Sequence, residues 1–64
     1  MQSKEKIQNQ YAELKDLLLS IEVDLLKNLS GNKSAGVRAR KTLREVKRKA
    51  TEIIKDTIAL EKQE

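Results

Sequence analysis

The chain of 64 residues contains no cysteine, histidine, tryptophan, phenylalanine or proline. Because cysteine and histidine are the usual ligands of structural zinc, and only cysteine forms disulfides, neither kind of cross-link can support a small core. A chain this short commonly needs idealised helix packing or self-association to be stable. The remaining serines and carboxylates form no grouping of nucleophile, base and orienting residue. We therefore expect a protein that is not an enzyme, with no catalytic residue, metal, cofactor or small-molecule substrate.

Composition favours an all-α fold. Charged residues make up 38% of the chain and Tyr11 is the one aromatic residue, which is typical of long helices and untypical of sandwiches or barrels. Disorder is the competing interpretation, but the net charge is only +4 and the apolar residues are regularly spaced. No apolar run approaches the roughly 20 residues of a membrane span, and the first residues contain no hydrophobic signal region. The expected location is the cytoplasm, with no membrane association.

The only break signal lies near the middle, in the stretch LSGNKSAG, which contains both glycines. Gly31 can take the left-handed conformation that ends a helix, and Asn32 or Ser34 can cap the next helix. Gly36 then falls in the first turn of the second helix, either because the helices approach closely there or because glycine is tolerated near a helix end. The sequence predicts one domain over residues 1–64, with helices at about 3–29 and 34–62 and a turn at about 30–33.

Both predicted helices carry apolar residues at alternating steps of four and three, the heptad spacing that buries one stripe against another helix. The first stripe consists of Ile7, Tyr11, Leu14, Leu18, Ile21 and Leu25, and the second of Ala39, Leu43, Val46, Ala50, Ile53, Thr57 and Leu60. Two such stripes joined by a short turn predict an antiparallel two-helix hairpin.

Further apolar residues lie outside these stripes, where a single partner helix cannot cover them. They are Leu17, Leu19, Val23, Leu26, Leu29, Ile54 and Ile58. We expect them to mediate homo-oligomerisation, most simply as a dimer that forms a four-helix bundle. The alternative is a monomeric hairpin with an exposed apolar face.

The positive charge is concentrated in one stretch. Residues 33–49 hold eight basic residues against Glu45 alone, a net charge of +7, whereas residues 1–32 sum to −1 and residues 50–64 to −2. On a helix most of these basic residues share a face that points away from the core. Arg38 and Lys49 fall on the other flank, beside acidic residues of the same helix that can neutralise them. A charge run is usually only a solvated face, but here acids are nearly absent and arginine equals lysine in number.

We therefore expect this face to contact the phosphates of double-stranded DNA. It has no aromatic residue for base stacking and no Asn or Gln for reading adenine, so binding should be largely independent of sequence. RNA is the alternative polyanion. The alternative function is a helical scaffold or adaptor that binds a protein partner and has no nucleic-acid affinity. The predicted DNA-binding residues are Lys33, Arg38, Arg40, Lys41, Arg44, Lys47, Arg48 and Lys55.

The segment GNKSAGVRARKTLREVKRKATEIIKDTIALEK resembles small bacterial histone-like proteins similar to the chlamydial linker-histone-like protein. Its most specific part is GNKSAGVRARK, residues 31–41, and the preceding LKDLLLSIEVDLLK looks like the family's first helix. The resemblance implies a DNA-binding protein of the bacterial nucleoid that acts in chromosome condensation, with a helical oligomerising part. The family's signature falls on Gly31, Asn32, Ala35, Gly36, Arg38, Arg40 and Lys41, which either hold the turn or contact DNA.

The chlamydial members continue into a long lysine- and alanine-rich tail, whereas this chain ends at IALEKQE. The resemblance therefore implies a tailless member in which the helical part makes the contacts with DNA, with modest affinity that depends strongly on salt. The combined expectation is an oligomer that bridges or compacts DNA through the basic face of its second helix.

Overall fold

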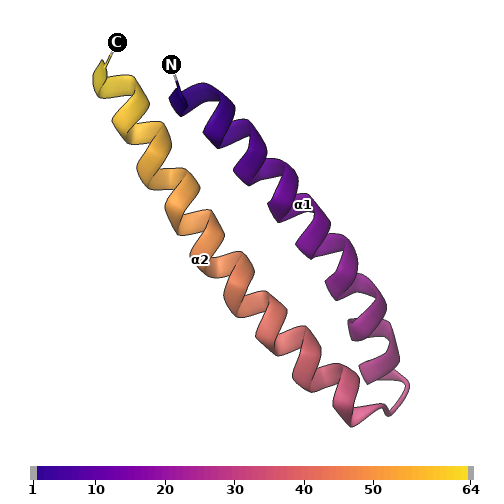
Figure 1. Cartoon of the computed structure of the whole chain (residues 1–64). Helices are drawn as coiled ribbons and strands as arrows, with labels where there is room; N and C mark the ends of the chain where they lie inside the picture. Colours follow the sequence, from indigo (N-terminus) through magenta and orange to yellow (C-terminus); the bar gives the residue numbers. More distant parts are fainter. Residues whose placement is uncertain (1, 64) are drawn as a thin grey trace.

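The computed structural model describes the backbone of residues 2–63 and the side chains of residues 4–62. Helix α1 (Gln2–Leu29) and helix α2 (Lys33–Gln63) account for this part of the chain apart from three turn residues, and no strand occurs within it. The helices run antiparallel and side by side, so that both ends of the chain lie at one end of the rod and the turn at the other (Figure 1). The rod measures 50 × 14 × 11 Å. The predicted all-α fold, with two helices packed against each other, is confirmed.

Gly31 ends α1 in a backbone conformation that other residues rarely adopt, with φ = 106°. Its N–H donates to the carbonyl of Asn28 at 2.9 Å, and the N–H of Asn32 donates to the carbonyl of Lys27 at 3.0 Å. Together these bonds form a Schellman motif, which satisfies carbonyls that the last turn of a helix leaves free. The Oδ1 of Asn32 accepts the N–H of Ala35 at 3.0 Å and so caps α2. The left-handed glycine is therefore as predicted, and of the two candidate caps, Asn32 and Ser34, the structure uses Asn32.

Gly31→Ala is expected to destabilise the hairpin by about 1–2 kcal/mol, because a Cβ disfavours this left-handed backbone. Apart from Gly31 and its two chain neighbours, no described heavy atom lies within 4 Å of the position that a Cβ would take, so the cost comes from the backbone conformation. Gly31→Asn, which tolerates positive φ better, should recover part of the loss. Thermal unfolding followed by circular dichroism measures both variants, and equal melting temperatures for wild type and Gly31→Ala would contradict the expectation.

The helices pack closely beside the turn. Ala35 is 0% exposed and Ala39 is 2% exposed. A Cβ at Gly36 would overlap the side-chain amide of Asn28, whose Nδ2 donates to the carbonyl oxygen of Asn32 at 3.2 Å. Glycine at position 36 thus leaves room for the Asn28 side chain, which would have to shift if a Cβ were added, and this favours close approach of the helices over simple tolerance of glycine near a helix end.

The side of α1 that faces α2 differs from the predicted stripe. Tyr11, Leu18 and Leu25 are 56%, 49% and 43% exposed, and so do not lie between the helices. Gln10, Leu17 and Asp24, each one position earlier, face α2 instead. The two polar residues find partners on α2. For example, the Nε2 of Gln10 donates to the Oδ2 of Asp56 at 3.0 Å. The inner side of α1 consists of Ile7, Gln10, Leu14, Leu17, Ile21, Asp24 and Asn28.

On α2, Leu43 departs from the predicted stripe because it is 46% exposed, and the half-buried Thr42 takes its place. The inner side of α2 includes Ala35, Ala39, Thr42, Val46, Ala50, Ile53, Thr57 and Leu60. Among the described side chains, the buried apolar ones are only Ile21, Ala35 and Ala39. The core of the single hairpin is therefore very small.

Three ion pairs line one flank of the contact between the helices, here called the ion-pair side. They are Lys6 with Asp56 at 3.4 Å, Glu13 with Lys49 at 2.7 Å, and Asp24 with Arg38 at 3.2 Å. In each pair the two residue numbers add to 62, so the helices keep one register along the rod. Almost all of these residues immediately precede an inner residue of their helix.

Residues that immediately follow an inner residue lie on the opposite flank, because each step turns a helix by about 100°. Seven of the large residues at these positions are apolar and 43–76% exposed. Charged residues stand between them: Lys15, Glu22, Arg40, Lys47 and Glu61. We call this flank the open side. Its apolar residues are Tyr11, Leu18, Leu25, Leu29, Leu43, Ile54 and Ile58.

The residues predicted to mediate oligomerisation are thus distributed over three places. Leu17 is half-buried between the two helices of the hairpin. Leu29, Ile54 and Ile58 lie on the open side. The remaining three lie on the side of α1 that faces away from α2, here called the back of α1: Leu19, Val23 and Leu26, which are 64%, 54% and 60% exposed.

Candidate nucleic-acid interface

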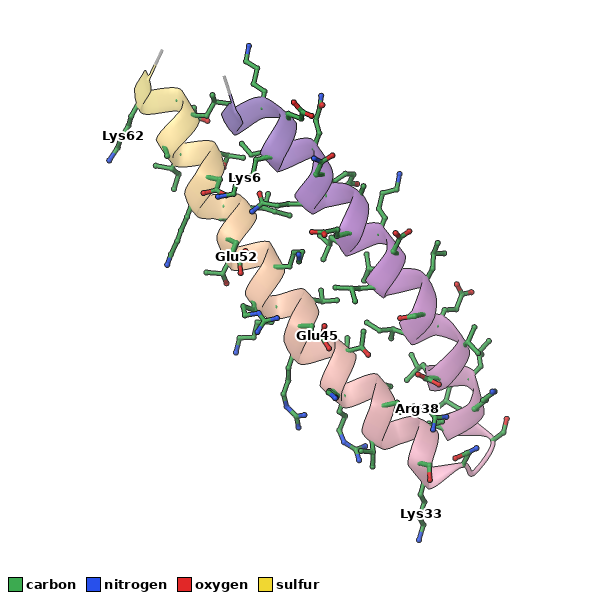
Figure 2. All side chains as sticks on the ribbon, viewed as in Figure 1. Lys6, Lys33, Arg38, Glu45, Glu52 and Lys62 are labelled. Atoms are coloured by element: carbon green, nitrogen blue, oxygen red, sulfur yellow. The ribbon has the colours of Figure 1, made fainter. Side chains whose placement is uncertain are left out.

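The side of α2 that is turned away from α1 is basic. Seven of the eight predicted DNA-binding residues are exposed there, within a sector of about 120° at about 100° per residue. No acidic residue falls among them in this sector. Figure 2 shows Lys33, at the start of α2, pointing away from α1. We call this surface the outer basic face, formed by Lys33, Arg40, Lys41, Arg44, Lys47, Arg48 and Lys55.

The outer basic face is long enough to follow a nucleic-acid backbone. From Lys33 to Lys55 it extends over about 33 Å, at about 1.5 Å per residue, which is close to one turn of B-DNA. Lys41, Arg44 and Arg48 line one shallow hollow on this surface together with Glu45. Because arginine presents a planar fork of donors that matches phosphate oxygens, the face is suited to several phosphates at once.

The start of α2 adds to this positive charge. The partial charges at helix ends favour acids in the first turn and bases in the last. Glu5 in the first turn of α1, Lys27 in its last turn and Lys62 in the last turn of α2 all follow that rule. The first turn of α2 has no acidic residue and instead begins with Lys33. The end of the hairpin that lies beside the turn is therefore electropositive, a feature that the residues KSAG carry but that the sequence analysis did not identify.

Arg38, the eighth predicted DNA-binding residue, lies on the ion-pair side. Its Nε donates to the Oδ1 of Asp24 at 3.2 Å, and its side chain remains 53% exposed. In Figure 2 it lies on the side of α2 that faces α1, near the turn. Lys49 likewise donates to the Oε1 of Glu13 at 2.7 Å. Both residues were expected to pair with acids of their own helix; the structure instead pairs them with α1, because the register places each opposite a carboxylate.

The signature residues of the resemblance divide into two groups. Five of them hold the turn and the adjacent helix contact, through the bonds and packing described above. These five are Gly31, Asn32, Ala35, Gly36 and Arg38. Arg40 and Lys41 instead belong to the outer basic face. The signature therefore describes a turn together with the beginning of a charged surface.

Neither helix, within residues 2–63, has a stretch both long enough and apolar enough to cross a membrane. Among the described residues, the acidic side chains form no cluster of three that could hold a metal ion.

A protein-family model describes most of the chain. The model for the histone H1-like protein Hc1 matches residues 8–63. The matched range contains the turn, the open side and the whole outer basic face. No curated protein and no solved structure gives a significant match.

Proposed function

Since the chain belongs to the family of the histone H1-like protein Hc1, we propose that it binds double-stranded DNA in the nucleoid through the outer basic face of α2. The observation that carries this proposal is the row of seven exposed basic residues, with the acid Glu45 at its edge. Proteins that neutralise several phosphates release counterions from DNA, and this release supplies most of the affinity of sequence-independent binding. The electropositive start of α2 supports an anionic ligand at the same surface.

Binding is proposed to be independent of base sequence. Direct reading of bases needs side chains that reach into a groove, commonly Asn or Gln on adenine, and base stacking needs aromatic rings. The outer basic face has neither kind of residue, and Tyr11, the one aromatic residue, lies on α1. Contacts from arginine and lysine to phosphate position a protein on the duplex without reading its sequence.

Compaction or bridging of DNA requires more than one basic face per particle, and we therefore include homo-oligomerisation, most simply a dimer, in the proposal. Large apolar side chains that the hairpin leaves exposed support it. Leu17 is left out because it is half-buried within the hairpin. The exposed members of the predicted set are Leu19, Val23, Leu26, Leu29, Ile54 and Ile58.

Fluorescence anisotropy with a labelled duplex tests the proposal. Binding at about 50 mM salt should weaken steeply as salt is added and should differ little between duplexes of unrelated sequence. A duplex RNA of matched length shows whether the face distinguishes the two polyanions. Absence of binding to duplex DNA at about 50 mM salt, with an oligomer still present in light scattering, would refute the proposal and favour the scaffold or adaptor.

Arg38 and Arg40 should behave differently when each is replaced by glutamine. Arg38→Gln removes the pair with Asp24 and should lower stability by about 0.5–1 kcal/mol, with little change in DNA affinity. Arg40→Gln breaks no ion pair among the described residues, so it should change the melting temperature less than Arg38→Gln does and should reduce the slope of log affinity against log salt by about 1. Thermal melts and salt titrations of both variants measure the difference. If Arg38→Gln also lowers the salt slope, then Arg38 contacts DNA as the sequence predicts.

A further inference from the structure

Among the described residues, the open side holds more large exposed apolar side chains than any other side of the hairpin. Seven large apolar side chains from both helices lie along it, at 43–76% exposure. Four of them, Tyr11, Leu18, Leu25 and Leu43, have the heptad spacing of residues that face the centre of a helical bundle, yet the partner helix of the hairpin does not cover them. The opposite flank is occupied by the three ion pairs and is polar. The hairpin therefore has one polar broad side and one broad side on which large apolar side chains from both helices alternate with charged ones.

The area of the hairpin indicates how much surface a partner would have to cover. The accessible surface is 5206 Å² for a chain of 7.3 kDa. A compact monomer of that mass exposes about 4,200 Å². The excess of about 1,000 Å² is close to the roughly 800 Å² that each partner buries in a stable interface of standard size. A second copy of the same hairpin, joined through the same side, would bury an area of this size.

Two symmetric arrangements place one open side on another. In the first arrangement the two-fold axis is perpendicular to the helices, so that α2 of one copy packs against α2 of the other. The two outer basic faces then lie side by side, about 10 Å apart. With the axis along the helices, each α2 lies on the α1 of the other copy, and the faces point in opposite directions, more than about 20 Å apart. The screening length is about 8–10 Å, so the second arrangement removes most of the repulsion between the faces and the first does not.

The register of the hairpin also favours the axis along the helices. A two-fold axis along the helices leaves the position of every residue along the rod unchanged. Within one hairpin, residues whose numbers add to 62 lie at the same level along the rod. The same is therefore true between a residue of α2 and a residue of α1 in the second copy. Arg40 then lies level with Glu22 of the second copy, and Leu43 within one residue of the level of Leu18 of the second copy. The same register brings Lys47 level with Lys15 of the second copy, a pair of like charges that opposes the arrangement. The Nζ of Lys15 lies over the ring of Tyr11, 5.7 Å from its centre.

We propose that two hairpins join through their open sides into a four-helix bundle whose two-fold axis runs along the helices, with the two outer basic faces on opposite sides. Only the functional consequence of this arrangement, that one dimer can hold two DNA duplexes at once, rests on the proposed function. The arrangement itself requires no DNA, and all of its tests are made without DNA. Failure of DNA binding would therefore leave the bundle intact, and failure of the bundle would leave binding by a single face intact.

Neighbouring leucines provide a matched pair of variants. Leu18→Glu with Leu25→Glu places two charges on the open side, and Leu19→Glu with Leu26→Glu places the same charges one residue later, on the back of α1. Light scattering at equal concentration should give twice 7.3 kDa for wild type and for the second variant, and 7.3 kDa for the first. A wild type of single mass, an unchanged mass of the first variant, or dissociation of the second variant alone would each overturn the proposal.

A distance measurement covers the case in which the first variant fails to fold. In the variant Arg44→Cys, one spin label is attached per chain at the middle of the outer basic face. The distance between the two labels of a dimer is measured by pulsed electron paramagnetic resonance. The proposed bundle predicts a separation of about 30 Å from helix spacing and side-chain length. A separation of about 15 Å would establish the axis across the helices, and one of about 45 Å would establish contact through the back of α1. Either result would overturn the proposal.

Discussion

The combined substitutions Arg40→Gln, Arg44→Gln, Lys47→Gln and Arg48→Gln should weaken binding to duplex DNA by more than about 100-fold at about 50 mM salt. These residues form the middle of the outer basic face, and all four are exposed. Among the described residues, none of them takes part in an ion pair with an acid. Their loss should therefore remove phosphate contacts without removing an ion pair that holds the two helices of one hairpin together.

The dependence on salt gives a sharper measure than affinity at one concentration. Seven phosphate contacts predict a slope of about −6.3 in log affinity against log salt, which is a loss of about 6,000-fold between 50 and 200 mM. Three contacts, left after the four substitutions, predict a slope of about −2.7 and a loss of about 40-fold over the same range. A salt titration of both proteins by fluorescence anisotropy measures the two slopes.

The four lysines of α1 provide the control for net charge: Lys4, Lys6, Lys15 and Lys27. Their replacement by glutamine lowers the formal net charge from +4 to 0, as the substitutions on α2 do. Of the four, Lys6 also loses its ion pair with Asp56. If the position of the charge matters, the α1 variant keeps a slope near that of wild type. Equal losses in the two variants would show that the net charge of the particle, and not the outer basic face, determines binding. Circular dichroism of both variants shows whether each remains helical.

Ala35→Leu is expected to cause the largest loss of stability from a single substitution. Ala35 is 0% exposed, where the first turn of α2 packs against the end of α1. Inserting a larger side chain into a well-packed contact costs about 1–3 kcal/mol. Small single cores rarely supply more than about 3–5 kcal/mol, so this is a large fraction of the stability of the fold. The melting temperature should fall by about 10 °C or more.

Val37→Leu is the matched control for this prediction, because Val37 lies in the same part of α2 but is 59% exposed. It should melt within a few degrees of wild type at the same protein concentration. If Ala35→Leu also melts like wild type, then the helices can separate beside the turn at no cost, and the close packing inferred there is wrong.

Much of this fold could be predicted from the sequence because the informative residues are local. Gly31 and Asn32 specify a helix end and a cap through their own backbone and side-chain geometry. The inner side of α1 could not be predicted in the same way. Tyr11, Leu18 and Leu25 form a regular apolar stripe in the sequence. The observed inner side instead includes Gln10 and Asp24, which bind Asp56 and Arg38 of α2. A pattern within one helix does not contain that information.

The candidate interface shows the same division. The outer basic face follows from helical periodicity and from the absence of acids, both of which are present in the sequence. The position of Arg38 depends on the register between the helices, which brings it to Asp24, 14 residues earlier in the chain. Residue type alone therefore does not distinguish an arginine that faces solvent from one that holds the neighbouring helix.

The constant register has a further consequence for how the chain folds. Asp24 and Arg38 are 14 residues apart, whereas Glu13 and Lys49 are 36 apart, and both pairs enclose the same turn. Each doubling of a closed loop costs about 0.6 kcal/mol, but once an inner pair has formed, the next pair closes only the few residues beyond it. The two helices can thus pair progressively from the turn at Gly31 toward the ends of the chain. In that order of events, substitutions around the turn change mainly the folding rate, and substitutions near the chain ends change mainly the unfolding rate.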